Sequence, residues 1–155
     1  MKPGTRTEMM ERLGFFIGTW TVEVTHPHLQ PNPIVGETKF EWLDETYIIQ
    51  RTHIDKAEFP SSTVIYDWDS ASGNYVQHYF DTRGVTRLYQ MSFEGGVWKL
   101  WREAADFSPL DFLQRFIGEI DESGNVIESV WEQSEDGVDW KPDFKLLFKR
   151  KERAL

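Results

Sequence analysis

The stretch that decides the fold runs from Asn74 to Arg102: Asn74-Tyr-Val-Gln-His-Tyr-Phe-Asp-Thr-Arg-Gly-Val-Thr-Arg-Leu-Tyr-Gln-Met-Ser-Phe-Glu-Gly-Gly-Val-Trp-Lys-Leu-Trp-Arg102. It contains three runs rich in aromatic and β-branched residues, separated by turn sequences at Gly84 and at Gly95. Runs of this kind, joined by short turns, are typical of consecutive antiparallel strands. The stretch therefore predicts a β-meander.

The Gly95-Gly96 dipeptide determines which side chains of this meander share a face. A two-residue turn there pairs Phe93 with Trp98 and Tyr89 with Arg102. One face of the sheet then carries Arg87, Tyr89, Met91, Phe93, Trp98, Leu100 and Arg102. That face is apolar beside the glycines and cationic at its other end. It predicts the inner lining of a small barrel, with an apolar floor and a polar mouth.

The rest of the chain repeats the strand pattern on both sides of this stretch. Residues 5–8 fit a capping box and predict a helix over residues 6–13 that ends at Gly14. Alternating runs predict further strands at residues 19–26, 34–43, 46–55, 63–69, 112–120 and 125–133, and a last one after Asp136-Gly137. Long connections fall at residues 27–33, 56–62 and 104–111. We expect one all-β domain over residues 1–155, an antiparallel up-and-down barrel of about ten strands with a short N-terminal helix closing one end.

Composition narrows the class of protein. A chain of 155 residues with 39% hydrophobic and 15% aromatic residues can bury a sizeable core and is not disordered. The absence of cysteine excludes disulfides, thiolate metal sites and cysteine nucleophiles. A net charge of −9 disfavours nucleic acid and anionic membranes as partners. With no apolar run long enough for a membrane span and no signal-peptide pattern, we expect a cytoplasmic protein.

Polar side chains gather at one end of the predicted strands, where the long connections lie. A two-residue turn at Asp44-Glu45 turns Arg51 and His53 inward, and one at Thr82-Arg83 does the same for His78. Pairing Gln114 with Trp131 places Gln114 inside and Arg115 outside. The candidate ligand-binding residues are therefore Arg51, His53, His78, Arg87, Tyr89, Arg102 and Gln114.

Two interpretations of these residues remain open. The arginines are either rim charges that reach solvent or the cationic part of an anion site. His53 or His78 is either a structural histidine or an acid–base group working with Tyr89, so the sequence does not decide whether the protein is an enzyme. The pair in His26-Pro-His28 has no third ligand nearby, and we expect no metal. No nucleophile elbow, phosphate loop or dinucleotide fingerprint is present in the sequence.

Several motifs carry a family resemblance, and they are spread over nearly the whole chain: Phe16-Ile-Gly-Thr-Trp20, Phe40-Glu-Trp-Leu43, Ile49-Gln-Arg51, Gln77-His-Tyr-Phe-Asp81, Arg83-Gly-Val85, Gln114-Arg-Phe116 and Trp131-Glu-Gln-Ser134. In these motifs the chain resembles a bacterial calycin-like family of unknown function, and the resemblance implies a lipocalin-like barrel. More distantly it is similar to the nitrobindins, whose haem is bound by a histidine on a C-terminal strand. No histidine follows His78 here, so we expect no haem. We expect no other cofactor either. Arg87-Leu-Tyr89 resembles the Arg-x-Tyr pair of fatty-acid-binding proteins, although it lies in a different strand.

These observations predict a binding protein. We expect a small amphipathic, anionic molecule in the barrel, with its acidic group held by Arg87, Tyr89 and Arg102 and its tail or ring on the apolar floor. The alternatives are an enzyme that uses the same cavity and a structural or dimerisation module without a ligand. The protein is expected to be a monomer or a homodimer. Neither the ligand nor the pathway follows from the sequence.

Overall fold

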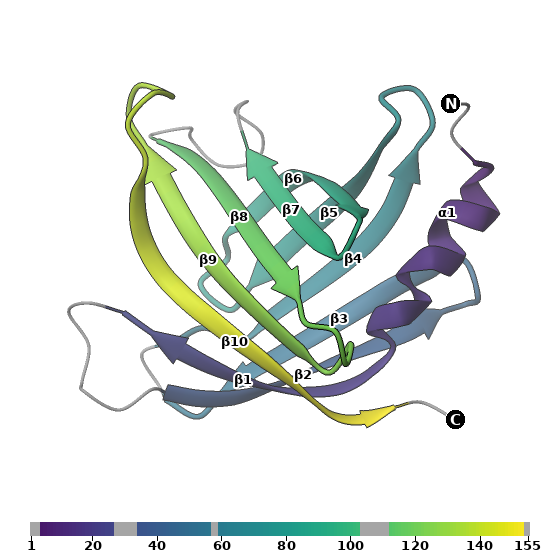
Figure 1. Cartoon of the computed structure of the whole chain (residues 1–155), viewed down its shortest axis with the longest axis horizontal. Coiled ribbons are helices and arrows are strands. Elements are labelled where there is room, and N and C mark those ends of the chain that lie inside the picture. The colour runs from purple at the N-terminus through teal and green to yellow at the C-terminus, as the bar shows by residue number, and fades with distance from the viewer. Residues whose placement is uncertain (1–3, 27–33, 57–58, 103–111, 154–155) are drawn as a thin grey trace.

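Alternating apolar positions along the chain build ten strands, each hydrogen-bonded to the next in antiparallel fashion (Figure 1). The first strand also pairs with the last, so the sheet closes into a barrel. This computed structural model describes residues 4–26, 34–56, 59–102 and 112–153. Closure supplies the outer strands with hydrogen-bonding partners that an open sheet lacks. The predicted antiparallel up-and-down barrel with a short N-terminal helix is confirmed.

The elements follow one another in the order expected from the sequence, with bounds that differ from the predicted ones by a residue or so in most cases. They are α1 (Arg6–Arg12), the 3-10 helix η1 (Leu13–Phe16), β1 (Gly18–Thr25), β2 (Ile34–Leu43), β3 (Tyr47–Ile54), β4 (Ser62–Asp69), β5 (Asn74–Asp81), β6 (Thr86–Glu94), β7 (Val97–Arg102), β8 (Leu113–Ile120), β9 (Val126–Ser134) and β10 (Lys141–Arg153). Among the described residues, no helix has the length and hydropathy needed to cross a bilayer.

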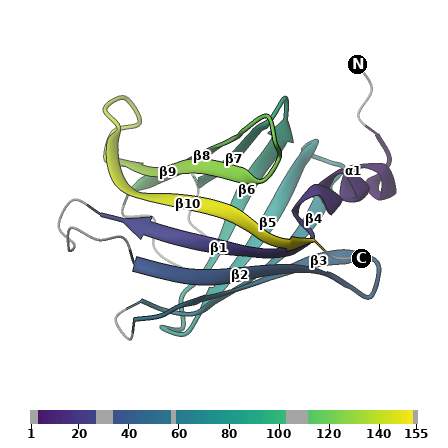
Figure 2. The ribbon, with the colours of Figure 1, turned by 60° about the horizontal axis from the view of Figure 1, so that its bottom comes forward.

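The N-terminal helical segment fills one end of the barrel. Thr5 caps α1 by accepting a hydrogen bond from the backbone N–H of Glu8, as the capping box predicts. The helix lies at the same end as the turn between β2 and β3 (Figures 1 and 2). At this end Phe16 of η1 lies 5.2 Å from the ring of Phe40 and 4.8 Å from that of Trp98. The expected closure of one end by the helix is confirmed.

Arg150 of β10 joins the helical segment to the strands that close the barrel, and the sequence analysis did not identify it. Its guanidinium lies 4.1 Å from the ring centroid of Trp20 in β1. It also donates hydrogen bonds to the carbonyl oxygens of Phe15 (2.9 Å) and Gly124 (3.1 Å). One side chain therefore contacts β1, η1 and the β8–β9 turn. Lysine in this position would lose some of these contacts, because it lacks the planar set of donors with which arginine bonds several acceptors at once.

The length of the turn between β2 and β3 shows that two of the predicted site residues lie on the other face of the sheet. Leu43 pairs with Tyr47, so the loop has three residues rather than two. A one-residue change of register moves every side chain of a strand to the opposite face. The prediction that Arg51 and His53 face inward is therefore wrong. Their side chains are 62% and 72% exposed, and Arg51 contacts Glu41 on the outer surface.

The turn between β5 and β6 is also one residue longer than predicted, and this changes the face on which His78 lies. The backbone N–H of Asp81 bonds the carbonyl of Val85, and Gly84 has a positive φ of 82°, which produces a three-residue loop. His78 pairs with Leu88 and lies on the outer face, between the inward positions Gln77 and Tyr79. The inward prediction for His78 is wrong, and Tyr79 takes the inward place.

The inward predictions for the other four candidate site residues, Arg87, Tyr89, Arg102 and Gln114, are confirmed. Gly95 and Gly96 form the two-residue turn between β6 and β7, so Met91 pairs with Leu100 and Phe93 with Trp98. The predicted pairing across β8 and β9 was wrong by two residues, since Gln114 pairs with Gln133. A two-residue change keeps each side chain on its face. Gln114 is accordingly buried, and Arg115 lies outside.

Candidate functional site

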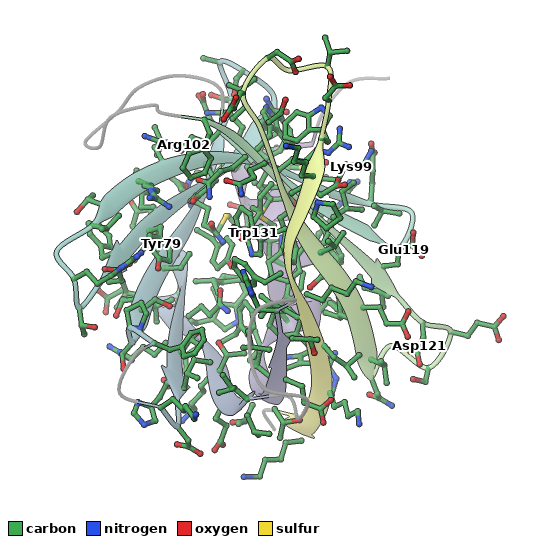
Figure 3. The ribbon with its side chains drawn as sticks, turned by 90° about the vertical axis from the view of Figure 1, so that its left-hand side faces the viewer. Tyr79, Lys99, Arg102, Glu119, Asp121 and Trp131 are labelled. Carbon is green, nitrogen blue, oxygen red and sulfur yellow. The ribbon has the colours of Figure 1, made fainter. Side chains whose placement is uncertain are left out.

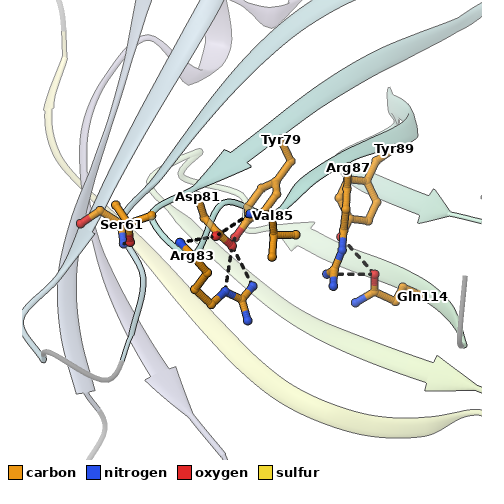
Figure 4. Close-up of polar contacts among 9 residues, drawn as sticks. Ser61, Tyr79, Asp81, Arg83, Val85, Arg87, Tyr89 and Gln114 are labelled. Carbon is orange, nitrogen blue, oxygen red and sulfur yellow. Dashed lines mark hydrogen bonds and ion pairs between the residues drawn. The ribbon is translucent and has the colours of Figure 1, made fainter. Parts of the chain in front are cut away.

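Four inward side chains on β6, β7 and β8 form a polar cluster near the end of the barrel opposite α1. We call Arg87, Tyr89, Arg102 and Gln114 the inner polar cluster. The hydroxyl of Tyr89 donates to Oε1 of Gln114 at 3.1 Å, and Nη1 of Arg87 reaches the same oxygen at 3.5 Å (Figure 4). Arg102 is 3% exposed and pairs with Gln114 across β7 and β8. The cluster thus brings the Arg87 guanidinium and the Tyr89 hydroxyl to one amide oxygen, with Arg102 at the position opposite Gln114 on β7.

Arg87 has unused hydrogen-bonding capacity. Its Nε is buried and has no hydrogen-bond partner, and its bond to Gln114 is long. Within the described part of the chain, no carboxylate forms an ion pair with Arg87. A buried donor without a partner costs about 1–3 kcal/mol. An anion placed beside Arg87 would remove that cost.

A second polar group lies beside Arg87 and consists of Tyr79, Asp81 and Arg83. We call it the Tyr79 brace. Tyr79 pairs with Arg87 across β5 and β6 and donates its hydroxyl hydrogen to Oδ2 of Asp81 at 2.8 Å (Figure 4). Arg83 holds the same oxygen through Nη2 at 2.7 Å and through Nε at 3.1 Å. The carboxylate thereby fixes the Tyr79 ring on the inner face of the barrel. Sequence reasoning missed this group because the register error had placed Tyr79 outside.

The charge states within the brace follow from its hydrogen bonds. Burial acts to raise the pKa of Asp81, but hydrogen bonds from Arg83 and Tyr79 outweigh burial and lower it to about 2. Burial, together with the hydrogen bond to Asp81, raises the pKa of Tyr79 above its ordinary value. Asp81 is therefore a carboxylate at neutral pH and Tyr79 a neutral phenol. The Tyr79 hydrogen points at Asp81, which leaves the oxygen of Tyr79 as an acceptor.

Deeper in the barrel, a chain of hydrogen bonds crosses β2, β3, β4 and β5. The hydroxyl of Thr52 bonds that of Thr38 at 2.7 Å, and Thr38 accepts from Gln50 at 2.9 Å. Tyr66 donates to Gln50 at 2.5 Å and accepts from Gln77 at 3.0 Å. Burial raises the pKa of Tyr66, so its hydroxyl stays protonated. We call these five residues the polar belt, and their mutual bonds make it a fixed part of the interior.

Aromatic rings line the inner wall near the polar cluster. The ring of Tyr89 lies 6.3 Å from Tyr79 on one side and 5.4 Å from Trp131 on the other, and Trp131 stacks on Phe144 at 6.3 Å. We call Tyr79, Tyr89, Trp131 and Phe144 the aromatic arc. Figure 3 looks toward this end of the barrel and shows Tyr79 and Trp131 within the ring of strands, with Asp121 projecting outward.

The apolar floor predicted from the sequence is already occupied. Phe16 contacts the rings of Phe93 and Trp98 at 4.9 and 4.8 Å. Met91, Trp98 and Leu100 are at most 2% exposed. The helical segment therefore covers the surface that we expected to receive a tail or ring. That part of the prediction is wrong, because the floor residues form the packing surface for η1.

Two hollows are found at the end of the barrel opposite the helix. One, of about 330 Å³, lies between Gln133, Ser134 and Lys141 at the β9–β10 hairpin. The other, of about 440 Å³, lies between His53, Phe59 and Thr82. The first hollow is also lined by the carboxylates of Glu135, Asp136 and Asp139, and its residue Gln133 pairs with Gln114 across β8 and β9.

The structure thus separates the seven predicted site residues into two groups. Arg87, Tyr89, Arg102 and Gln114 come together inside the barrel. Arg51, His53 and His78 lie outside, where Nδ1 of His53 contacts the hydroxyl of Ser61 at 3.2 Å. Among the residues that the structure describes, no group of three or more His, Asp and Glu residues is placed to hold a metal ion. His28 and residues 104–111 lie outside the described residues.

The fold and the site together define a class: a closed antiparallel barrel with helical packing at one end and an inward cationic cluster toward the other. Comparison with models of protein families and with curated proteins finds no match. Among solved structures, the crystal structure of Rv2717c from M. tuberculosis is similar to this chain, with a TM-score of 0.63 and 16% sequence identity. The similarity covers 92% of this chain and 97% of that one. At this level of identity the comparison shows a shared fold.

Proposed function

We propose that this protein is a calycin-like barrel that binds a small amphipathic anion near the inner polar cluster. The observation that carries the proposal is Arg87, an inward arginine whose buried Nε has no partner and which no described carboxylate neutralises. Most buried guanidinium groups are paired with carboxylates or phosphates. The geometry therefore favours a ligand that supplies the missing anion.

The neighbours of Arg87 suit an acidic group. The amide nitrogen of Gln114 donates no hydrogen bond to any described residue, so it can donate to a carboxylate beside Arg87. Arg102, opposite Gln114, adds a second positive charge. A planar guanidinium matches the geometry of a carboxylate and can donate two hydrogen bonds to it. The aromatic arc supplies apolar surface for the rest of the molecule.

The enzyme alternative lacks a geometric basis for the residues first considered. His53 and His78 both lie on the outer face, so neither reaches Tyr89 as an acid–base partner. Tyr89 itself donates to Gln114. Binding without chemical change is the function that these contacts support best.

Titration with anilinonaphthalenesulfonate, a fluorescent amphipathic anion, tests the proposal. Removing one charged partner from a shielded anion site typically costs about 2–5 kcal/mol. Arg87→Ala and Arg102→Ala should therefore each weaken binding more than about tenfold. Arg115→Ala is the matched control, because Arg115 lies outside and contacts Glu132 and Trp140. Equal binding by wild type and Arg87→Ala would refute the proposed site. Mass spectrometry of the freshly purified protein under native conditions would look for a retained ligand.

A further inference from the structure

We infer that the anion is a flat aromatic acid of one or two rings, and that its ring packs against the aromatic arc while its carboxylate meets Arg87. This inference rests on the proposed function and specifies the chemical class of its ligand. It follows from three features of the interior: where inward side chains stay exposed, which hydrogen-bond donors remain unused, and where the barrel is already filled.

The exposed fraction of the inward side chains is larger at Tyr79 and Phe144 than at the inward residues nearer the helix. The inward residues nearer the helix are almost fully buried, with Tyr75 at 1% and Phe148 at 4% exposed. Tyr79, two inward positions from Tyr75 on β5, is only partly buried, and so is Phe144, four residues before Phe148 on β10. Both also point into the barrel. The space that remains accessible along the inner wall therefore lies beside Tyr79, Trp131 and Phe144, whereas Tyr89 of the arc is only 3% exposed.

The surfaces that face this space are aromatic and donor-rich. The hydroxyl hydrogens of Tyr79 and Tyr89 are used by Asp81 and Gln114. The unused donors are on Arg87 and on the amide of Gln114, two side chains that contact each other through Nη1 and Oε1 at 3.5 Å. A ligand that fits these surfaces has one compact acidic group. The rest of it is apolar and matches the rings of Trp131 and Phe144.

The filled part of the barrel argues against a long alkyl chain. A chain that starts at Arg87 and runs toward the helix meets the polar belt, whose hydrogen bonds include the buried pair Tyr66–Gln50. Beyond it lie Met91 and Leu100, which are at most 2% exposed. Interiors packed to this extent do not admit extra methylene groups without disruption. A flat ring that stays at the level of the arc avoids this cost.

Calorimetric titration of the full chain with three acids tests the inference. The acids are naphthoate, its saturated counterpart decahydronaphthoate, and palmitate. An aromatic pair contributes about 0.5–1.5 kcal/mol beyond the area that it buries, so naphthoate should bind about two- to tenfold more tightly than decahydronaphthoate. Palmitate should bind more weakly than naphthoate. Arg87→Ala should weaken both bicyclic acids to a similar extent, since both carry the same carboxylate.

Two leucine variants test the contact itself. Phe144→Leu removes one partly buried ring of the arc and should reduce the preference for naphthoate over decahydronaphthoate. Phe80→Leu makes the same change on the outer face, where Phe80 is 41% exposed, and should leave the preference unchanged. Circular dichroism of each variant confirms that the barrel is folded.

The possible outcomes separate the two proposals. If decahydronaphthoate or palmitate binds as tightly as naphthoate, and Arg87→Ala still weakens the binding, the anion site stands and the aromatic inference is wrong. If Arg87→Ala leaves the binding of every acid unchanged, or if none of the acids binds, the proposed function is wrong as well. A preference for naphthoate that Phe144→Leu reduces and Phe80→Leu does not would support the inference.

Discussion

Asp81 shows how a single side chain can organise one end of the barrel. Its side chain is fully buried although the residue ends a strand, and it accepts hydrogen bonds from Tyr79, from the Arg83 guanidinium and from the backbone N–H of Arg83. Hydrogen bonds to an ionised acceptor are roughly twice as strong as neutral ones. Asp81 thus fixes both the β5–β6 loop and the Tyr79 ring.

Acid should weaken the fold through Asp81. Its folded pKa of about 2 lies below the ordinary 3.8, so its ionised form favours folding above pH 3.8. That contribution is lost as the pH falls through the folded pKa. Between the two pKa values, the unfolded protein binds up to about one proton more than the folded protein at Asp81, which makes stability depend on pH. We expect Asp81→Asn to remove this contribution and so to flatten the dependence of the free energy of unfolding on pH. Urea titrations across this pH range measure the effect.

Glu122→Gln provides the control for Asp81→Asn, because Glu122 is an exposed carboxylate in the β8–β9 turn. An unchanged pH dependence in Asp81→Asn would show that Asp81 does not titrate as its contacts indicate.

At the scale of the elements, turn length decided which site residues could be predicted. Gly95-Gly96 is a strong signal for a two-residue turn, and the inward positions derived from it are those that the structure shows. The other two turns contain an extra residue. At the first, Asp44 and Glu45 adopt positive φ angles of 52° and 60°, a conformation that favours glycine, so their sequence gave little sign of the geometry.

The strands beside those turns could not correct the error. Ile48 and Ile49 are adjacent and both buried, so apolar residues occur on both faces of β3. β5 likewise has Val76 and Phe80 outside and Tyr75 and Tyr79 inside. Where both faces carry apolar residues, the hydrophobic pattern specifies the register only weakly. Fold and strand order were therefore predictable, but the facing of Arg51, His53 and His78 was not.

Gly36 offers a test of how closely β2 and β3 approach. A Cβ at this position would lie 2.4 Å from the carbonyl oxygen of His53 and 2.9 Å from the Cα of Ile54. Because these are backbone atoms, the strand itself would have to move. We expect Gly36→Ala to lower the free energy of unfolding by about 1–3 kcal/mol, the usual cost of overpacking. Urea denaturation measures the change.

Gly14→Ala is the matched control for Gly36→Ala. A Cβ at Gly14 meets no atom within 4 Å. Alanine has the higher helix propensity, so this substitution should be neutral or slightly stabilising. Equal destabilisation by both substitutions would contradict the close approach of β2 and β3.

At the scale of the whole molecule, Arg150 connects the parts that close the barrel. Arg150→Ala leaves the carbonyl oxygens of Phe15 and Gly124 without this donor and removes the cation from the Trp20 ring. An unsatisfied buried carbonyl costs about 1–3 kcal/mol, and both of these are only partly buried, so we expect the free energy of unfolding to fall by about 1–3 kcal/mol. Arg150→Lys should recover only part of this loss, because lysine lacks the planar fork.

Lys151→Ala serves as the comparison on the same strand. Lys151 is exposed and contacts Glu37 at 3.4 Å, an exposed pair worth about 1 kcal/mol or less. Urea denaturation of the three variants should rank them in the order Arg150→Ala, Arg150→Lys and Lys151→Ala, from most to least destabilised. A loss in Arg150→Ala no larger than that in Lys151→Ala would show that Arg150 does not hold the closure together.

The packing of α1 and η1 into one end of the barrel also bears on the kinetics of exchange. Phe16 fills the interior between Phe40 and Trp98, so a guest molecule has no passage through that end. A ligand would then have to enter and leave through the opposite end of the barrel. If the barrel binds a ligand as proposed, one bound molecule has to leave before another can enter, and the rate of dissociation alone sets the rate of exchange.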